Sequence, residues 1–278
     1  MGVKAVAKRL IWLAAQVPAL RPLVIAGCSF RESGIHRRHP YDRANGTRTS
    51  GMLPNFLISP GEPIDAPTTS YSATQPSIIR TALAAIPAPR NCQFVDIGCG
   101  KGRPLLVATE FGFPAITGVE LSPALSRIAR RNAEIFARAH PERTRIGVVT
   151  GDALQYRLPE QKLVIFLYRP FDLAPTERLV ANIEASLRAA PRDLYIVSYN
   201  PVFAAPFDAS PLLERRYAAQ IPYHPSERGY GHDESDAVII WQNRGNPRPR
   251  PLGDPNTPVT IVTADWRAEI GTRGLQTA

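Results

Sequence analysis

Short apolar runs alternate with longer amphipathic segments through the middle of the chain. Runs of strand length occupy residues 93–97, 115–121, 146–149, 163–168 and 194–199. The segment that starts at Ser122 and Pro123 instead has apolar residues at helical spacing as far as Ala139, and Ser before Pro is a common helix start. Strands that alternate with helices predict an α/β fold, with a parallel sheet and helices on both faces.

Further elements flank this alternation. Helical spacing predicts helices over residues 75–86 and 105–111 and around Ile183, and the run at 237–242 predicts a late strand. The last part of the chain is rich in Pro and Arg, which predicts a disordered or loosely attached tail. We expect three parts: a basic N-terminal helix and connecting arm over 1–64, an α/β domain over 65–243, and a flexible tail over 244–278.

The first thirty residues allow three interpretations. Lys4 and Arg9 precede an apolar stretch, as in a signal peptide, but Arg21 and Pro22 interrupt that stretch. The same pattern fits a basic amphipathic helix that lies on a membrane surface, or a helix that packs on the domain. The stretch is shorter than the roughly 18 apolar residues of a membrane span, so we expect no spanning helix.

Positive charge is concentrated at the N-terminus. The whole chain carries a net charge of +9, and residues 1–50 alone hold nine Lys or Arg against two acids, hence +7. Residues 51–243 hold equal numbers of basic and acidic residues, so the body is not a nucleic-acid platform and nucleic acid is not the expected partner. The cysteines at positions 28, 92 and 99 form no CxxC pair, so we expect neither a metal site nor a disulfide framework.

A glycine-rich turn after the first predicted strand is the central chemical feature. Asp96 is followed by Gly98, Gly100 and Gly102, and glycines let the backbone turn sharply and approach a ligand closely. A dinucleotide-binding turn would need a glycine where Arg103 stands, which argues against a nicotinamide-dependent oxidoreductase. An acid at Asp96 suits a ligand that carries an ammonium group and a sulfonium.

Two more acids end the next two strands. Glu120 ends the second, where a carboxylate either accepts hydrogen bonds from ribose hydroxyls or merely faces solvent. Asp152 and Ala153 follow the third, where the Asp either accepts from an adenine amine or forms an ordinary turn. The carboxyl ends of parallel strands share one edge of a sheet, so we expect these acids to line one site.

In order and spacing, residues 96–102, Glu120 and Asp152 resemble the nucleotide-site motifs of class I S-adenosylmethionine-dependent methyltransferases. The resemblance implies a Rossmann-like seven-stranded methyltransferase sheet whose last strand is antiparallel. It also implies S-adenosylmethionine as the cofactor, bound by Asp96, the three glycines of the turn, Glu120, Asp152 and Ala153.

More narrowly, residues 41–50 and Tyr71 resemble a poorly characterised bacterial group of this class. That resemblance adds Tyr71 to the expected cofactor site. Because the methyl donor is made inside cells, we expect a cytoplasmic protein. Peripheral membrane contact through residues 1–30 stays open as an addition to that expectation.

The end of the fourth strand departs from amine-directed relatives. Those enzymes often place Asn or Asp before Pro, whereas this chain has Tyr168, Arg169 and Pro170, which we assign to the acceptor side. Arg169 has only donors, so it cannot orient an amine, and it either pairs with an anionic substrate or caps the edge of the site. Further candidates for the acceptor side are Tyr199, the Asn200-Pro201 pair and His224.

Two functions fit these observations. The first is a methyltransferase that acts on a small-molecule or protein acceptor, for which the protein mainly positions the acceptor and excludes water. The alternative is a non-catalytic module that binds S-adenosylmethionine, an interpretation that Arg169 favours.

Overall fold

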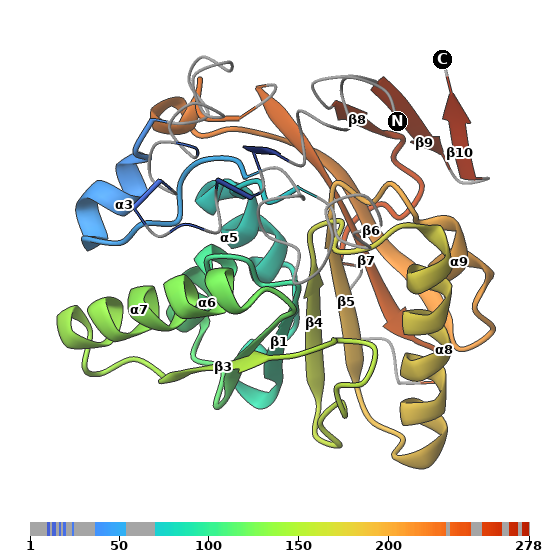
Figure 1. Ribbon diagram of the computed structural model, residues 1–278. Coiled ribbons are helices and arrows are strands. Elements are labelled where there is room, and N and C mark those ends of the chain that lie inside the picture. The colour runs from blue at the N-terminus through green and yellow to red at the C-terminus, as the bar shows by residue number, and fades with distance from the viewer. Residues whose placement is uncertain are drawn as a thin grey trace.

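The computed structural model describes residues 37–53, 70–231, 234–245, 252–262, 267–271 and 274–277, together with residues 10, 11, 13, 14, 17, 19, 20 and 24. A seven-stranded sheet runs through the centre of these residues (Figure 1), in the order β3-β2-β1-β4-β5-β7-β6. Its strands are β1 Gln93–Ile97, β2 Ile116–Glu120, β3 Ile146–Thr150, β4 Leu163–Leu167, β5 Leu194–Tyr199, β6 Leu213–Pro222 and β7 Ser235–Asn243. Strands β1 to β5 are parallel, and β7 is antiparallel to both of its neighbours, which confirms the predicted sheet.

Helices cover both faces of this sheet. They are α3 Pro40–Asn45, α5 Pro76–Ala84, α6 Arg103–Ala108, α7 Pro123–Ala139, α8 Leu173–Ala189 and α9 Ala205–Ala209, with short 3-10 turns at Pro89–Asn91, Thr109–Phe111 and Pro225–Glu227. Figure 1 shows α5, α6 and α7 on one side and α8 and α9 on the other. Successive strand residues point to opposite faces, so Phe94 belongs to the first hydrophobic cluster and Val95 to the second.

Strand β6 is a part of the sheet that the apolar pattern did not predict. It stands at the outer edge of the sheet, and Glu214, Arg215 and Arg216 interrupt its apolar positions. These three residues are only partly buried. The register also shifts between Arg215 and Tyr217. A strand that packs on one side alone tolerates such charges, and their presence conceals it from a search for apolar runs.

Part of the segment that follows the main sheet also forms strands within the described residues. Strands β8 Val259–Val262, β9 Arg267–Gly271 and β10 Gly274–Thr277 form a separate antiparallel sheet. Val259, Ile261 and Ile270 are buried in the second hydrophobic cluster. The alternation of Val259 and Ile261 gives β8 an apolar face that packs on the domain.

Residues 37–53, which we predicted to be part of a connecting arm, pack closely on the domain. Asp42 in α3 is fully buried, and the Arg48 N–H donates to Asn132 Oδ1 of α7 at 2.9 Å. Leu53 pairs with Tyr71 through two backbone hydrogen bonds. Most of the first thirty residues, for which three interpretations were open, lie outside the described residues. Among those that are described, no helix is both long and apolar enough to cross a membrane.

Candidate active site

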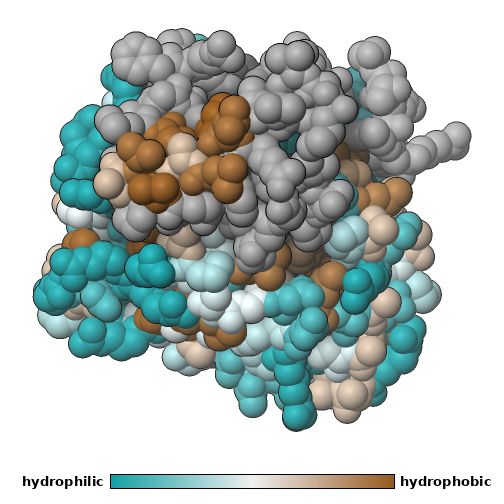
Figure 2. Space-filling view, in the orientation of Figure 1, coloured by the Kyte–Doolittle hydropathy of each residue, from teal (hydrophilic) through white to brown (hydrophobic). Residues whose placement is uncertain are grey.

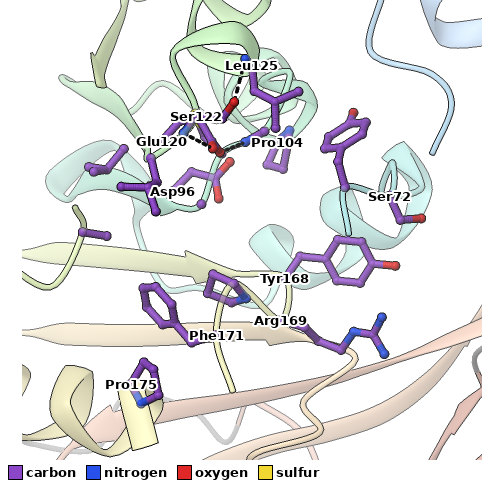
Figure 3. Close-up of a pocket in the computed structure, with 18 of the residues that line it drawn as sticks. Ser72, Asp96, Pro104, Glu120, Ser122, Leu125, Tyr168, Arg169, Phe171 and Pro175 are labelled. Carbon is purple, nitrogen blue, oxygen red and sulfur yellow. Dashed lines mark hydrogen bonds between the residues drawn. The ribbon is translucent and has the colours of Figure 1, made fainter. Parts of the chain in front are cut away.

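One cavity of about 400 Å³ opens at the carboxyl ends of the parallel strands (Figure 3). It brings together almost every residue that the sequence assigned to a site: Tyr71, Asp96, Gly98, Gly100, Glu120, Asp152, Ala153, Tyr168, Arg169 and Pro170. Of the residues assigned to the cofactor, Gly102 is outside this lining: it caps α6 in a left-handed conformation, and a Cβ atom there would lie 3.4 Å from Ala129 Cβ. The pattern did not predict Ser72, Thr74, Arg103, Ser122, Phe171 or Arg178, which also line the cavity.

The glycine turn forms one wall with its bare backbone. Gly98 and Gly100 have φ of +75° and +55°, a region that favours glycine. A Cβ atom at Gly98 would lie 2.8 Å from Pro170 Cβ, and one at Gly100 would lie 2.4 Å from Tyr71 Cε2. Tyr71 and Pro170 therefore close directly on the turn, and neither glycine can be replaced without moving a wall of the cavity.

Two carboxylates sit side by side behind this wall. Glu120 accepts hydrogen bonds at 2.8 Å from the backbone N–H groups of Gly100 and Ser122. Asp96 is 1% exposed, and its Oδ2 has no hydrogen-bond partner among the described residues. Burial raises the pKa of both acids, and the charge of Glu120 raises the pKa of Asp96 further. Asp96 therefore presents an unused buried acceptor to the cavity, which a cationic or donor group of a ligand would satisfy.

Asp152 forms hydrogen bonds within its own turn and lies at the cavity. Its carboxylate accepts from the Leu154 N–H at 2.9 Å and from Gln155 Nε2 at 3.3 Å, so it stabilises its own turn. Asp152 and Ala153 also line the cavity. The turn thus fixes a polar side chain at the rim.

A buried ion pair supports the glycine turn from the N-terminal side. Arg103 is 2% exposed and Asp42 fully buried, with Arg103 Nη2 3.4 Å from Asp42 Oδ2. The guanidinium also donates to Thr49 Oγ1 at 2.7 Å and to the Thr74 carbonyl at 2.6 Å. The position that argued against a dinucleotide site therefore has a structural role, which local sequence did not reveal because its partner stands 61 residues away.

Asp42 collects several hydrogen bonds besides Arg103. The Thr47 and Thr49 hydroxyls donate to it at 2.7 Å, and the Ser50 hydroxyl and Thr49 N–H donate as well. Burial alone would raise the pKa of Asp42, but Arg103 and these hydrogen bonds lower it to about 2. Through Thr49 the arm also reaches Tyr71, whose hydroxyl donates to the Thr49 carbonyl at 2.5 Å.

The opposite side of the cavity carries aromatic and basic side chains. Figure 3 shows Asp96 and Glu120 on one side, and Tyr168 and Arg169 across from them. Arg169 has φ of +44°, and its Cζ lies 5.9 Å from the centre of the Tyr168 ring. Arg178 of α8 lines the same cavity. Non-glycine residues with positive φ are costly and cluster at functional sites.

The other acceptor candidates form hydrogen bonds that stabilise the structure around the cavity. Asn200, with φ of +47°, donates through Nδ2 to Asp236 Oδ1 at 2.8 Å and accepts from the Ala237 N–H at 2.9 Å. The Tyr199 hydroxyl donates to Asp236 as well. Both ends of the Asn200 amide are thus engaged within the protein, so it stabilises the end of β5. His224 caps a short turn by accepting from the Ser226 N–H.

Residues 95–187 match a family model described as a methyltransferase domain. No curated protein matches the chain. Among solved structures, an RNA methyltransferase from Salinibacter ruber in complex with S-adenosyl-L-homocysteine is 19% identical, with 65% of this chain and 99% of that chain covered and a TM-score of 0.43. The cofactor-bound protein Rv0187 from MTB is 20% identical (63% and 83% covered, TM-score 0.45), and TrmN from Thermus thermophilus is 18% identical (60% and 48%, TM-score 0.44).

Similarity to solved structures at this level is too distant to bear on substrate. The matched domain, the strand order with an antiparallel β7, and the glycine turn with its two carboxylates identify the protein as a class I S-adenosylmethionine-dependent methyltransferase. Its cofactor is S-adenosylmethionine. The match to a methyltransferase domain favours this enzyme over a non-catalytic binding module.

Proposed function

We propose that the protein transfers the methyl group to a small-molecule or protein acceptor that carries an anionic group beside its nucleophilic atom. The observation that supports this proposal is the electrostatic division of the cavity. Asp96 and Glu120 line its side at β1 and β2, whereas Arg169 and Arg178 line its side at β4 and α8. A cationic cofactor suits the first side, and a carboxylate or phosphate suits the planar guanidinium groups of the second.

The cofactor side has a place for each part of S-adenosylmethionine. The unpaired Oδ2 of Asp96 suits the ammonium group, and Glu120 suits the ribose hydroxyls. Asp152 and Ala153 stand where they would hold the adenine. Gly98, Gly100 and Tyr71 would complete the wall against the methionine part. These roles are part of the proposal.

S-adenosylmethionine supplies a methyl group already activated by its sulfonium, so the protein mainly has to position the acceptor in line and exclude water. The Tyr168 ring and Pro170 form an apolar surface on the acceptor side of the cavity. Burial raises the pKa of the Tyr168 hydroxyl, which therefore stays protonated and can orient an acceptor as a hydrogen-bond donor. The Asn200 amide forms hydrogen bonds with Asp236 and with the Ala237 N–H. We therefore assign it no role in orienting an amine acceptor.

Small molecules and proteins fit this site better than nucleic acid. Residues 51–243, which contain the cavity, hold equal numbers of basic and acidic residues. Binding to nucleic acid depends largely on phosphate contacts from a basic surface. An acceptor with one anionic group needs only a local pair of arginines.

Variants at Arg169 test the assignment of the two sides. We expect Arg169→Asn and Arg169→Lys to bind S-adenosylmethionine as the parent protein does, by calorimetry, because the cofactor side is untouched. Labelled methyl transfer into a lysate from cells that lack the protein should fall in both, since Asn removes the charge and Lys removes the planar fork. Arg157→Asn, an exposed position outside the cavity lining, is the control.

Two results would overturn the proposal. Loss of cofactor binding in folded Arg169→Asn would show that Arg169 belongs to the cofactor side. Transfer by Arg169→Asn at the parent rate would show that the acceptor needs no guanidinium there.

A further inference from the structure

Large exposed hydrophobic side chains gather in one short segment of the described chain. Five of seven lie between residues 10 and 20, and the other two, Val149 and Leu173, stand apart. The five are Leu10, Ile11, Leu13, Val17 and Leu20, which are 37–62% exposed. Four of them are spaced three, four and three residues apart, which is the spacing of an amphipathic segment. Leu10, Ile11 and Leu13 are helical, whereas Val17 lies in a bend and Leu20 in a turn. We call these five residues the apolar patch, and Figure 2 shows brown side chains gathered at the upper left of the visible face.

The surroundings of the apolar patch are basic. Residues 1–31 contain five Lys or Arg and no acid. In the orientation that Figures 1 and 2 share, helix α3 is at the left of the molecule, and hydrophilic side chains cover that part of the visible face. The arginines of this region, Arg37, Arg38, Arg43 and Arg48, are exposed.

These four arginines have no carboxylate within ion-pair distance in the described part of the chain. Arg37 and Arg43 instead direct their guanidinium groups at the Tyr230 hydroxyl, at 3.2 Å and 3.5 Å. Asp42, the one acid of α3, is buried against Arg103 and neutralises no surface charge. Among the described residues, the surface at these four arginines is therefore positive and has no carboxylate that neutralises it.

We propose that the apolar patch and the arginines of residues 37–48 form one face that binds the surface of an anionic membrane. The apolar side chains would enter the boundary between headgroups and acyl chains, and the guanidinium groups would contact lipid phosphates. A symmetric pairing with a second copy would bring two strongly positive segments together, which opposes self-association through this face. Nucleic acid would satisfy the arginines but leave the apolar patch in water.

Vesicle sedimentation of the full chain tests the proposal. The vesicles are phosphatidylcholine alone, or phosphatidylcholine with one third phosphatidylglycerol, at low and high salt. We expect binding only to the anionic vesicles and less of it at high salt. Because each basic residue near such a surface adds about 1 kcal/mol, reversing two of them in R37E/R43E should weaken binding by about tenfold or more. L13E/V17E should weaken it similarly.

Matched controls change the same side chains elsewhere. Leu173→Glu alters an exposed hydrophobic residue outside the patch, and R157E/R188E reverses two exposed arginines, so both should bind vesicles as the parent does. Calorimetry with S-adenosylmethionine verifies that each variant is folded. Equal binding to both vesicle types, or to neither, would overturn the proposal. So would a dimer that L13E/V17E abolishes in sedimentation velocity without any vesicle binding.

Discussion

Two buried aspartates support the two sides of the cavity, and they do so with different partners. Asp42 supports the cofactor side, where Arg103 and the arm hold the glycine turn. Asp236 supports the acceptor side, where Tyr199 and Asn200 donate to it. Arg103 has donors only, whereas a tyrosine hydroxyl and an amide can each donate or accept. The cofactor side therefore depends on one fixed charge pair, while the acceptor side can adjust its hydrogen bonds.

The largest effect expected from this difference is the loss of stability in Asp42→Asn. The change leaves the Arg103 guanidinium buried without its anion, which typically costs about 3–5 kcal/mol of unfolding free energy. Urea denaturation measures it. The control is Glu110→Gln at the exposed Arg80 pair, where about 0–1 kcal/mol is expected. Equal losses in the two variants would contradict the assigned role of Asp42.

The same pair has a pH dependence whose sign follows from the pKa of Asp42, lowered to about 2. A lowered carboxyl pKa stabilises the folded state above the unfolded value, about 4, and this contribution is lost as the pH falls toward 2. The difference in unfolding free energy between Asp42→Asn and the parent should therefore become smaller in acid.

The second effect concerns cofactor affinity. Glu120→Ala should weaken S-adenosylmethionine binding by about tenfold or more, because hydrogen bonds to a charged acceptor contribute about 1.5–3 kcal/mol. Calorimetry gives the dissociation constant, and circular dichroism establishes that the domain is folded. Glu160→Ala, at an exposed acid outside the cavity lining, is the control. An unchanged dissociation constant in folded Glu120→Ala would remove Glu120 from the cofactor site.

A smaller loss is expected in Asp236→Asn. The new amide still accepts from Asn200, and the Tyr199 hydroxyl can turn to accept from its NH₂ group, so about 1 kcal/mol of unfolding free energy should be lost. Urea denaturation alongside Asp42→Asn compares the two directly. A loss as large as that of Asp42→Asn would show that the acceptor side is no more adjustable than the cofactor side.

A further effect is a pH dependence of cofactor binding through Asp96. Burial and Glu120 raise its pKa, so its contribution to stability is present at low pH and is lost as the pH rises through the raised value. A bound cation favours the ionised form, so affinity should increase with pH, by at most about tenfold per unit for one proton. Titration in buffers of different ionisation enthalpy detects the proton released. Asp96→Asn should abolish this release, and its persistence there would point to another group.

Local sequence was enough to predict the parallel strands and the acids at their ends. Each strand is a short apolar run; Asp96 lies near the end of β1, Glu120 is the last residue of β2, and Asp152 stands two residues after β3. Their convergence on one cavity follows from the geometry of parallel strands.

Long-range partners were beyond the same approach. Asp42 and Arg103 stand 61 residues apart, and Asn200 and Asp236 stand 36 apart. No periodic pattern links such residues, because their contact depends on how helices and strands pack in three dimensions. Strand β6 was not predicted for a different reason. Its partly exposed position at the edge of the sheet tolerates charged residues, and these interrupt the apolar pattern.

Residues 252–262, which follow the main sheet, limit how far the outer strand of that sheet is accessible to other molecules. Strand β6 is outermost, and an outer strand with free backbone groups tends to pair with other chains. Here the Ala218 N–H donates to the Asp254 carbonyl at 3.0 Å, and the Gln220 side chain accepts from the Thr260 N–H at 2.9 Å. Residues 252–262 thus occupy part of that edge. A chain that ended at residue 245 would expose it, and we expect such a protein to aggregate at concentrations at which the full chain stays dispersed.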